Sequence, residues 1–257
     1  MKTKSKMKIV WKILAGVAAL LIIGFILMIY NAFNGNFISG MVYKSRVTKY
    51  IAETYPDKNY TVSDYSYNFK TGRYDFEIID LDSPDGCFNA YYSDYDKAVV
   101  DTYENDVLNL FNTQSRLEKA LRDEIDPLID KHLDTKEKTV NGKYIGGEFG
   151  FVTCFIDGFD GDYLKGKLYL DMKADVKNMP IPTQAVLCLN TDESQSFPRV
   201  VKLANELKAL GYRIDYYDVS TSGKPYEMIP TDRLLAAESF NELEEFVMKD
   251  YDKIKED

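Results

Sequence analysis

The sharpest candidate for a metal site in the chain is a short acidic segment that contains Asp157, Asp160 and Asp162. Carboxylate oxygens are the ligands that hard cations such as calcium take, so this spacing makes the segment a candidate calcium site. It lacks the longer ligand run and the terminal glutamate of a calcium-binding hand. Its Asp-Gly pairs also suit the turn of a β-hairpin, which is the alternative interpretation. The sequence predicts no other metal site and no cofactor.

The single histidine, His132, restricts the catalytic chemistry that the chain can perform. A histidine-based triad would have to use it, and zinc sites with two or more histidines are impossible. His132 lies at a probable helix end, where a cation complements the helix dipole. There is no G-x-S-x-G and no C-x-x-C, and residues 222–225 lack the preceding glycine of a phosphate loop. We therefore predict no catalytic residues.

Six tyrosines crowd the region of the expected first sheet: Tyr65, Tyr67, Tyr74, Tyr91, Tyr92 and Tyr95. A sheet face lined by tyrosine can bind peptides or glycans. The alternative is that the rings on one face of each strand pack on a neighbouring helix. Because Tyr91 and Tyr92 are consecutive, one of them must face away from that helix. This pair leaves a small opening for a binding surface.

An apolar run at residues 9–30 would decide on which side of a membrane all of these residues lie. Its last 18 residues, 13–30, contain no charge, amide or proline, which is the length of a membrane-spanning helix. A cleaved signal peptide has a shorter apolar region that ends at small residues, and the residues around position 30 are bulky. We therefore expect an uncleaved membrane anchor over residues 9–30.

Charge gives this anchor a direction. The formal net charge of the chain is −9, yet residues 1–12 hold five lysines and no acid. Lysine beside an apolar run stays on the cytoplasmic side, so the residues after the anchor should lie outside the cell membrane. Those residues are strongly acidic and would repel phosphate backbones, so we expect no nucleic-acid partner.

The three cysteines, Cys87, Cys154 and Cys188, are too few for a disulfide scaffold. Cys154 and Cys188 lie in apolar runs, which predicts buried free thiols. A single disulfide between two of the three is the alternative.

The chain after the anchor reads as two small α+β domains. Helical spacing over residues 43–55 precedes period-two alternation in four segments between residues 60 and 103, which predicts a helix on an antiparallel meander. Helical spacing returns over 106–133, and the polar stretch 134–147 is the expected boundary. We place the first domain at 43–133 and the second at 148–257.

The second domain is expected to be a mixed strand-helix-strand domain. Strands are predicted over 149–156 and 166–175, joined by the acidic segment as a hairpin, and over 184–189 and 212–219. A helix that begins near Ser196 separates the last two strands, which are therefore expected to be adjacent and, where a right-handed crossover joins them, parallel. A final helix is expected over 239–251.

Two resemblances follow from these patterns. The helix that ends in Tyr55-Pro56, the Thr71-Gly72 turn and the strand at 73–78 resemble the PepSY and cystatin-like modules of bacterial extracytoplasmic proteins. The lysine-flanked anchor, the motif at residues 34–39 (Asn-Gly-Asn-Phe-Ile-Ser, with Phe37 in place of a proline) and the helix and strand at 197–219 resemble the YfjL-like membrane proteins of Gram-positive bacteria. That resemblance implies a fold and a membrane anchor, and no activity.

Taken together, these patterns predict an α+β protein whose anchor, with its basic N-terminus, occupies residues 1–33. Its expected role is that of a non-enzymatic binding or regulatory module, attached to the membrane through residues 9–30. Its partner would be a protein or another part of the cell envelope. The alternative is a carboxylate-dependent or calcium-dependent hydrolase of the cell surface.

Overall fold

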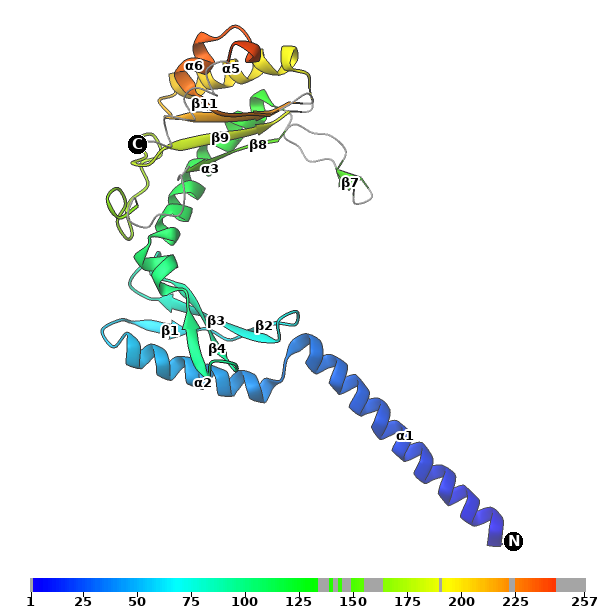
Figure 1. Cartoon of the computed structure of the whole chain (residues 1–257). Helices are drawn as coiled ribbons and strands as arrows, with labels where there is room; N and C mark the ends of the chain where they lie inside the picture. Colours follow the sequence, from blue (N-terminus) through cyan, green and yellow to red (C-terminus); the bar gives the residue numbers. More distant parts are fainter. Residues whose placement is uncertain are drawn as a thin grey trace. The chain divides into compact units, whose positions relative to one another are not determined.

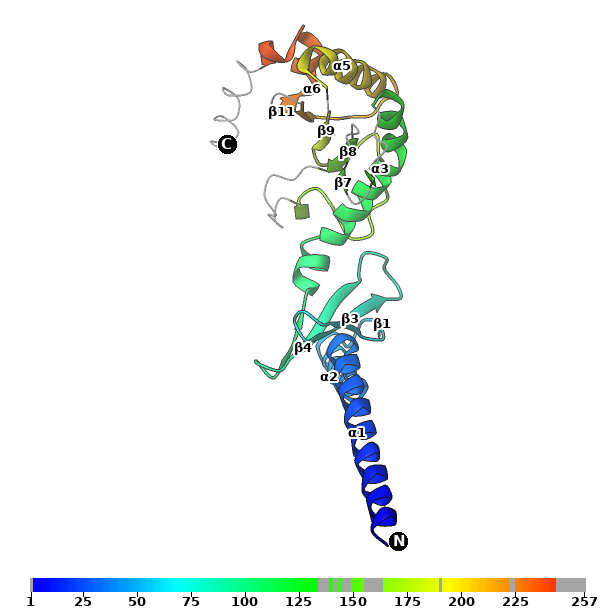
Figure 2. The ribbon, with the colours of Figure 1, turned by 90° about the vertical axis from the view of Figure 1, so that its right-hand side faces the viewer.

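The computed structural model describes residues 2–133, 139–140, 143–144, 149–154, 164–189, 191–221 and 225–243, and side chains from residue 11 onward within 2–133, 164–189, 191–221 and 225–243. The chain forms two compact units, Met1–Val107 and Leu108–Asp257. The first contains an N-terminal apolar helix and an antiparallel sheet, and the second a mixed sheet with helices (Figures 1 and 2). The predicted α+β fold class is confirmed.

The first unit begins with two helices, α1 (Lys2–Asn34) and α2 (Phe37–Thr54). They are separated by Gly35, whose φ of +75° is the left-handed conformation that glycine adopts without strain. Asn36 caps α2, because its Oδ1 accepts hydrogen bonds from the backbone N–H groups of Ile38 and Ser39. This cap explains why α2 begins before the expected position 43.

An antiparallel sheet of five short strands packs on α2. Its order is β1-β3-β4-β5, and β2 also pairs with β3. The first of the four segments expected between residues 60 and 103 is thus divided into two strands, β1 and β2. The core lies between helix and sheet, where Val47 and Ile51 of α2 and Phe76 and Ile78 of β3 are buried. The strands are β1 (Tyr60–Val62), β2 (Ser66–Asn68), β3 (Arg73–Asp80), β4 (Phe88–Ser93) and β5 (Ala98–Asp101).

The helix expected over 106–133 is divided as well. A π-helical turn, η1 (Glu104–Leu108), is followed by α3 (Phe111–His132). Between them Leu110 adopts a left-handed φ of +62°, which interrupts the α-helical hydrogen bonds. Pro127 lies inside α3 without ending it.

The second unit is built on a four-stranded sheet of order β11-β10-β9-β8. Strands β9 and β10 pair in parallel, with Tyr217 opposite Ala185, and the other two pairs are antiparallel. The expected parallel pair, joined through a helix, is confirmed. The elements are β8 (Phe149–Cys154), β9 (Thr183–Cys188), α5 (Glu193–Ala209), β10 (Tyr216–Ser220), β11 (Pro225–Pro230) and α6 (Thr231–Ala236), together with a two-stranded pair, β6 (Thr139–Val140) and β7 (Lys143–Tyr144).

Helix α3 shares its core with this second unit. It packs against β8 and α5, as Figures 1 and 2 show. Its stripe of Leu117, Leu121, Ile125 and Ile129 is fully buried in one cluster with side chains of α5 and β9. The sequence placed this helix in the domain 43–133 because its periodicity shows that one face is buried without showing what covers that face.

The strand predicted over 166–175 is wrong. The described part of this segment consists of turns and irregular chain, and Asp171 has a left-handed φ of +60°. Leu168 is nonetheless buried in the core of the second unit, and Leu170 and Met172 pack against that core. The alternation of apolar residues therefore reports burial of an irregular segment.

Candidate functional site

The end of α1, the two residues after it and the first turn of α2 form what we call the elbow, residues 34–40. Tyr74 holds it from β3: the backbone N–H of Asn36 donates to the Tyr74 hydroxyl, which donates in turn to the Asn36 carbonyl at 3.1 Å. Gly40 lies directly against the Tyr65 ring, since a Cβ added there would be 2.2 Å from that ring. The first sheet therefore fixes the point where the apolar helix ends.

Two carboxylates on the sheet accept hydrogen bonds from tyrosines of the segment 43–55. Asp101 accepts from Tyr50 at 2.7 Å and from Tyr55 at 3.2 Å, and Asp94 accepts from Tyr43 at 2.5 Å. The Tyr55 ring also contacts Tyr60, Phe88 and Tyr103, with centroids 4.6 to 5.7 Å apart. We call Tyr43, Tyr50, Tyr55, Asp94 and Asp101 the tyrosine–aspartate network.

The electrostatics of this network keep its hydroxyls protonated. The hydrogen bond to Asp94, followed by burial, raises the pKa of Tyr43 to about 12. Burial is the largest cause that raises the pKa of Tyr50 and of Tyr55, and Asp101 adds to it in both. A phenol with a raised pKa stays protonated at neutral pH, where it donates hydrogen bonds and is a poor acid. The network is therefore suited to hold α2 on the sheet.

The six tyrosines proposed from sequence as a binding face differ in how far their rings are covered. Tyr65, Tyr67 and Tyr74 pack on the elbow and one another, and Tyr92 stacks on Tyr43 at 5.5 Å. Tyr91 is half-buried, with the Arg73 guanidinium 4.2 Å from its ring centre. Tyr95, in the turn between β4 and β5, is 95% exposed. Of the six, Tyr95 alone presents a fully exposed ring.

A small pocket lies beside the last turns of α2. Its volume is about 210 Å³, and its lining includes Ile51, Tyr55, Lys58 and Tyr60. Burial raises the pKa of Tyr60, whose hydroxyl has no hydrogen-bond partner of good geometry within the described part of the chain. Pockets for small-molecule ligands usually have volumes of roughly 300–1,000 Å³, so this one falls below the usual size.

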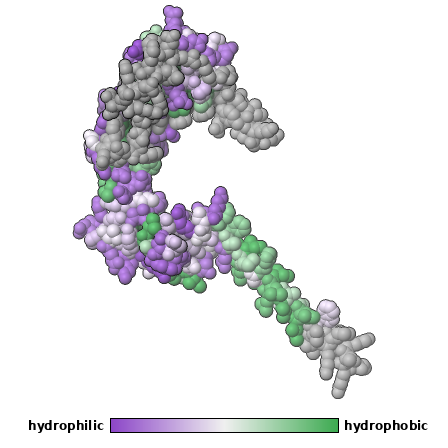
Figure 3. Space-filling model, in the orientation of Figure 1, coloured by the Kyte–Doolittle hydropathy of each residue, from purple (hydrophilic) through white to green (hydrophobic). Residues whose placement is uncertain are grey.

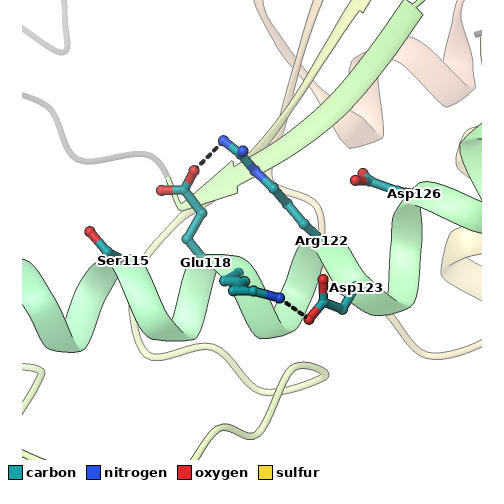
Figure 4. Close-up of a pocket in the computed structure, with 6 residues that line it drawn as sticks. Ser115, Glu118, Arg122, Asp123 and Asp126 are labelled. Atoms are coloured by element: carbon teal, nitrogen blue, oxygen red, sulfur yellow. Dashed lines mark hydrogen bonds and ion pairs between the residues drawn. The ribbon is translucent and has the colours of Figure 1, made fainter. Parts of the chain in front are cut away.

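A larger hollow, of about 400 Å³, lies along the charged face of α3. Figure 4 shows two ion pairs there, Glu118 with Arg122 at 2.5 Å and Lys119 with Asp123 at 2.6 Å. Asp126 lies apart from both, and one of its carboxylate oxygens is buried with no hydrogen-bond partner among the residues that the structure describes. Burial raises the pKa of Asp126, which Arg122 opposes. The lining of the hollow is mostly charged, whereas the lining of small-molecule sites is mostly apolar.

His132 ends α3, as predicted, and contacts Glu206 of α5. Its Nε2 lies 2.5 Å from one carboxylate oxygen of Glu206, and the Lys131 ammonium lies 2.6 Å from the other. Lys131 and then His132 lower the pKa of Glu206. The imidazole is almost fully buried between the two helices, so its contact is explained by helix packing.

The candidate calcium ligands Asp157, Asp160 and Asp162 lie outside the residues that the structure describes. Within the described residues, no group of three or more His, Cys, Asp or Glu side chains could hold a metal ion. Cys188 is a half-buried free thiol, and burial raises its pKa. The side chain of Cys154 lies outside the described residues.

Sequence reasoning did not identify Asp94, Asp101 or the contact at Gly40. An aspartate in a turn, such as Asp94, is common in any sequence and does not by itself indicate a partner. Their partners are 46 to 51 residues away in the chain. No local spacing could have indicated such pairs.

Comparison with known proteins gives one finding. Residues 10–109 match the family model of the YfjL-like, N-terminal domain. The match covers α1, the elbow, α2, the first sheet and η1, and it supports the YfjL-like resemblance for this part of the chain. No curated protein and no solved structure matches the chain.

Proposed function

We propose that the protein is a single-pass, membrane-anchored module that acts outside the cell membrane by binding a protein or another component of the cell envelope, without catalysis. The anchor is residues 9–30, the N-terminus faces the cytoplasm, and the residues that follow the anchor lie on the other side. The observation that carries the proposal is the apolar surface of α1, together with the position of the lysines.

Two facts support the anchor. Among the described residues, one helix, at the N-terminus, is long and apolar enough to cross a membrane. Its apolar side chains are exposed over its whole described length, from Trp11 to Phe33, as the hydrophobic surface in Figure 3 illustrates. A water-soluble protein would bury such a surface, because it is far larger than the apolar patches that soluble monomers expose.

A binding role is supported by the use that the first unit makes of its polar groups. The hydroxyls of Tyr43, Tyr50 and Tyr55 donate to the carboxylates of Asp94 and Asp101, and these bonds hold α2 on the sheet. Groups that are engaged in this way are poorly placed to transfer protons to a substrate. Tyr95, with its exposed ring, is the residue of this unit best placed to meet a partner, because exposed tyrosine is enriched at interfaces.

The alternative, a carboxylate-dependent or calcium-dependent hydrolase, has one observation in its favour. Asp126 is a carboxyl with a raised pKa in an open hollow, and perturbed carboxyls in clefts are typical of active sites. Its neighbours Glu118 and Asp123 are each paired with a cation of the same helix. A second carboxyl poised for hydrolysis is therefore missing from the described lining of this hollow.

Photo-crosslinking in intact cells tests the binding role. The full chain carries benzoylphenylalanine at position 95, or as a matched control at the exposed Tyr169 of the second unit. We expect an adduct with a discrete envelope component at position 95 only. Absence of an adduct at position 95 would contradict a binding site around Tyr95.

Calcium titration of the full chain tests the alternative. Heat of calcium binding that disappears in Asp160→Asn and persists in Asp171→Asn would favour the hydrolase reading over the binding module. Asp171 is the control because it lies in the same unit, within an irregular segment.

A further inference from the structure

Six large apolar side chains surround the end of α1 and are not covered by the rest of the first unit. They are between 44% and 67% exposed, although residues around them on the elbow and the sheet are well packed. We call them the apolar collar: Phe33, Phe37, Ile38, Met41, Val42 and Phe69.

The outer face of α2 changes character along its length. Ile38, Val42, Ser45 and Lys49 follow one another at helical spacing on a single line, opposite the buried stripe of Gly40, Val47 and Ile51. The first two are apolar and the next two polar, and all four are exposed. An ordinary surface helix is polar along its whole outer face.

The apolar part of this face is confined to the start of the helix. Residues 37–42 extend only about 9 Å along the axis. The hydrophobic outer surface therefore lies next to the end of α1, and Figure 3 shows hydrophobic surface where α2 begins as well as along α1.

The collar is held in place relative to the anchor's last turn. The ring of Phe33, in α1, lies 5.5 Å from the ring of Phe69, in the turn between β2 and β3. Tyr74 and the Asn36 cap fix the backbone between α1 and α2. The collar is thus continuous with the apolar surface of α1, and it cannot move away without breaking the elbow.

We propose that the apolar collar is inserted into the outer leaflet of the same bilayer that α1 crosses, so that the first unit lies on the membrane surface. This inference rests on the proposed anchor. An apolar helix face enters roughly 5–10 Å into the boundary between headgroups and acyl chains. The exposed Lys70, next to Phe69, extends its ammonium toward the lipid phosphates. The polar line from Ser45 onward stays in water.

Tryptophan quenching by lipid tests the collar in the full chain. The chain contains one tryptophan, Trp11, near the start of the apolar run, so it reports the anchor without any substitution. The variant Ile38→Trp with Trp11→Phe reports the collar. Lys49→Trp with Trp11→Phe is the matched control, because position 49 lies on the same line of α2 as position 38. The protein is reconstituted in vesicles of phosphatidylcholine brominated near the headgroup end of its acyl chains.

The three signals distinguish failure of the collar from failure of the anchor. We expect bromine to reduce the fluorescence of Trp11 and of the tryptophan at position 38 several-fold, and to leave that at position 49 unchanged. Equal quenching at positions 38 and 49, with Trp11 quenched, would overturn the collar and leave the anchor in place. If Trp11 itself is not quenched, the anchor fails and the collar with it.

Discussion

At the scale of single residues, Gly40 is the glycine of the first unit at which an added Cβ would come nearest to another side chain, the ring of Tyr65. The sequence indicated Gly40 as part of a turn, since Ser39-Gly40 follows Asn34-Gly35-Asn36. The structure places it inside α2, where the missing Cβ lets the ring of Tyr65 approach the helix. A glycine that serves a turn and one that serves a close approach look the same in sequence, because only the distant partner differs.

Gly40→Ala should destabilise the first unit. An added Cβ would lie 2.2 Å from the Tyr65 ring, and overpacking of this kind costs roughly 1–3 kcal/mol. That outweighs the ~1 kcal/mol that alanine gains over glycine inside a helix. Thermal unfolding of the full chain measures the effect. Gly24→Ala is the control, because its added Cβ would meet no atom within 4 Å, and it should not lower the melting temperature. Unchanged or raised stability in Gly40→Ala would show that the contact is not tight.

Asp126 gives a prediction with a definite pH dependence. Burial raises its pKa in the folded state, so ionisation disfavours folding. The cost is absent below the ordinary pKa of 3.8, where the carboxyl is protonated in both states, and it appears as the pH rises through the folded value. Asp126→Asn should therefore raise the melting temperature of the second unit at pH 7, with a gain that shrinks as the pH falls toward 3.8.

The matched control for this titration is Asp130→Asn, one turn away on the exposed face of α3. It should raise the melting temperature less than Asp126→Asn at pH 7. A gain at Asp126 that stays constant across the pH range would mean that removal of the charge is not its cause.

At the scale of elements, periodicity predicted which faces are buried better than it predicted their partners. The α2 face, the antiparallel strands of the first unit and the parallel pair β9–β10 were all expected from spacing alone. The same reasoning gave the apolar stripe of α3 correctly. It could not show that α3 packs on α5 and β8, because tertiary contacts over such sequence distances leave no local pattern. The alternation around Leu168 predicts a strand because the apolar residues of this irregular segment, which are buried or half-buried, also alternate with polar ones.

The assignment of α3 to the second unit is testable. Ile125→Ala removes a fully buried side chain from that core, and such truncations cost about 2–5 kcal/mol. Hydrogen exchange followed by mass spectrometry should show faster exchange in peptides from α5 and β9. Peptides from β3 and β4 should be unchanged. Loss of protection in the first unit instead would place α3 with the sheet that precedes it.

At the scale of the whole molecule, the proposed function depends on the anchor and on the direction in which it crosses the membrane. The apolar length and the lysine cluster were evident from sequence, because membrane insertion depends on composition over a continuous segment. The family match over residues 10–109 covers the same part of the chain. Activity could not be predicted at this scale, since no motif of the sequence names a substrate and the polar groups of the first unit proved to bond with one another.

Protease treatment of intact cells, with detection through an epitope at the C-terminus, tests this claim most directly. If the residues that follow α1 lie outside the cell, a protease added to unbroken cells should remove the epitope from the membrane-bound chain. A cytoplasmic protein in the same cells should survive as the control. Digestion that occurs only after the cells are lysed would contradict the orientation, and recovery of the full chain in the soluble fraction would contradict the anchor itself.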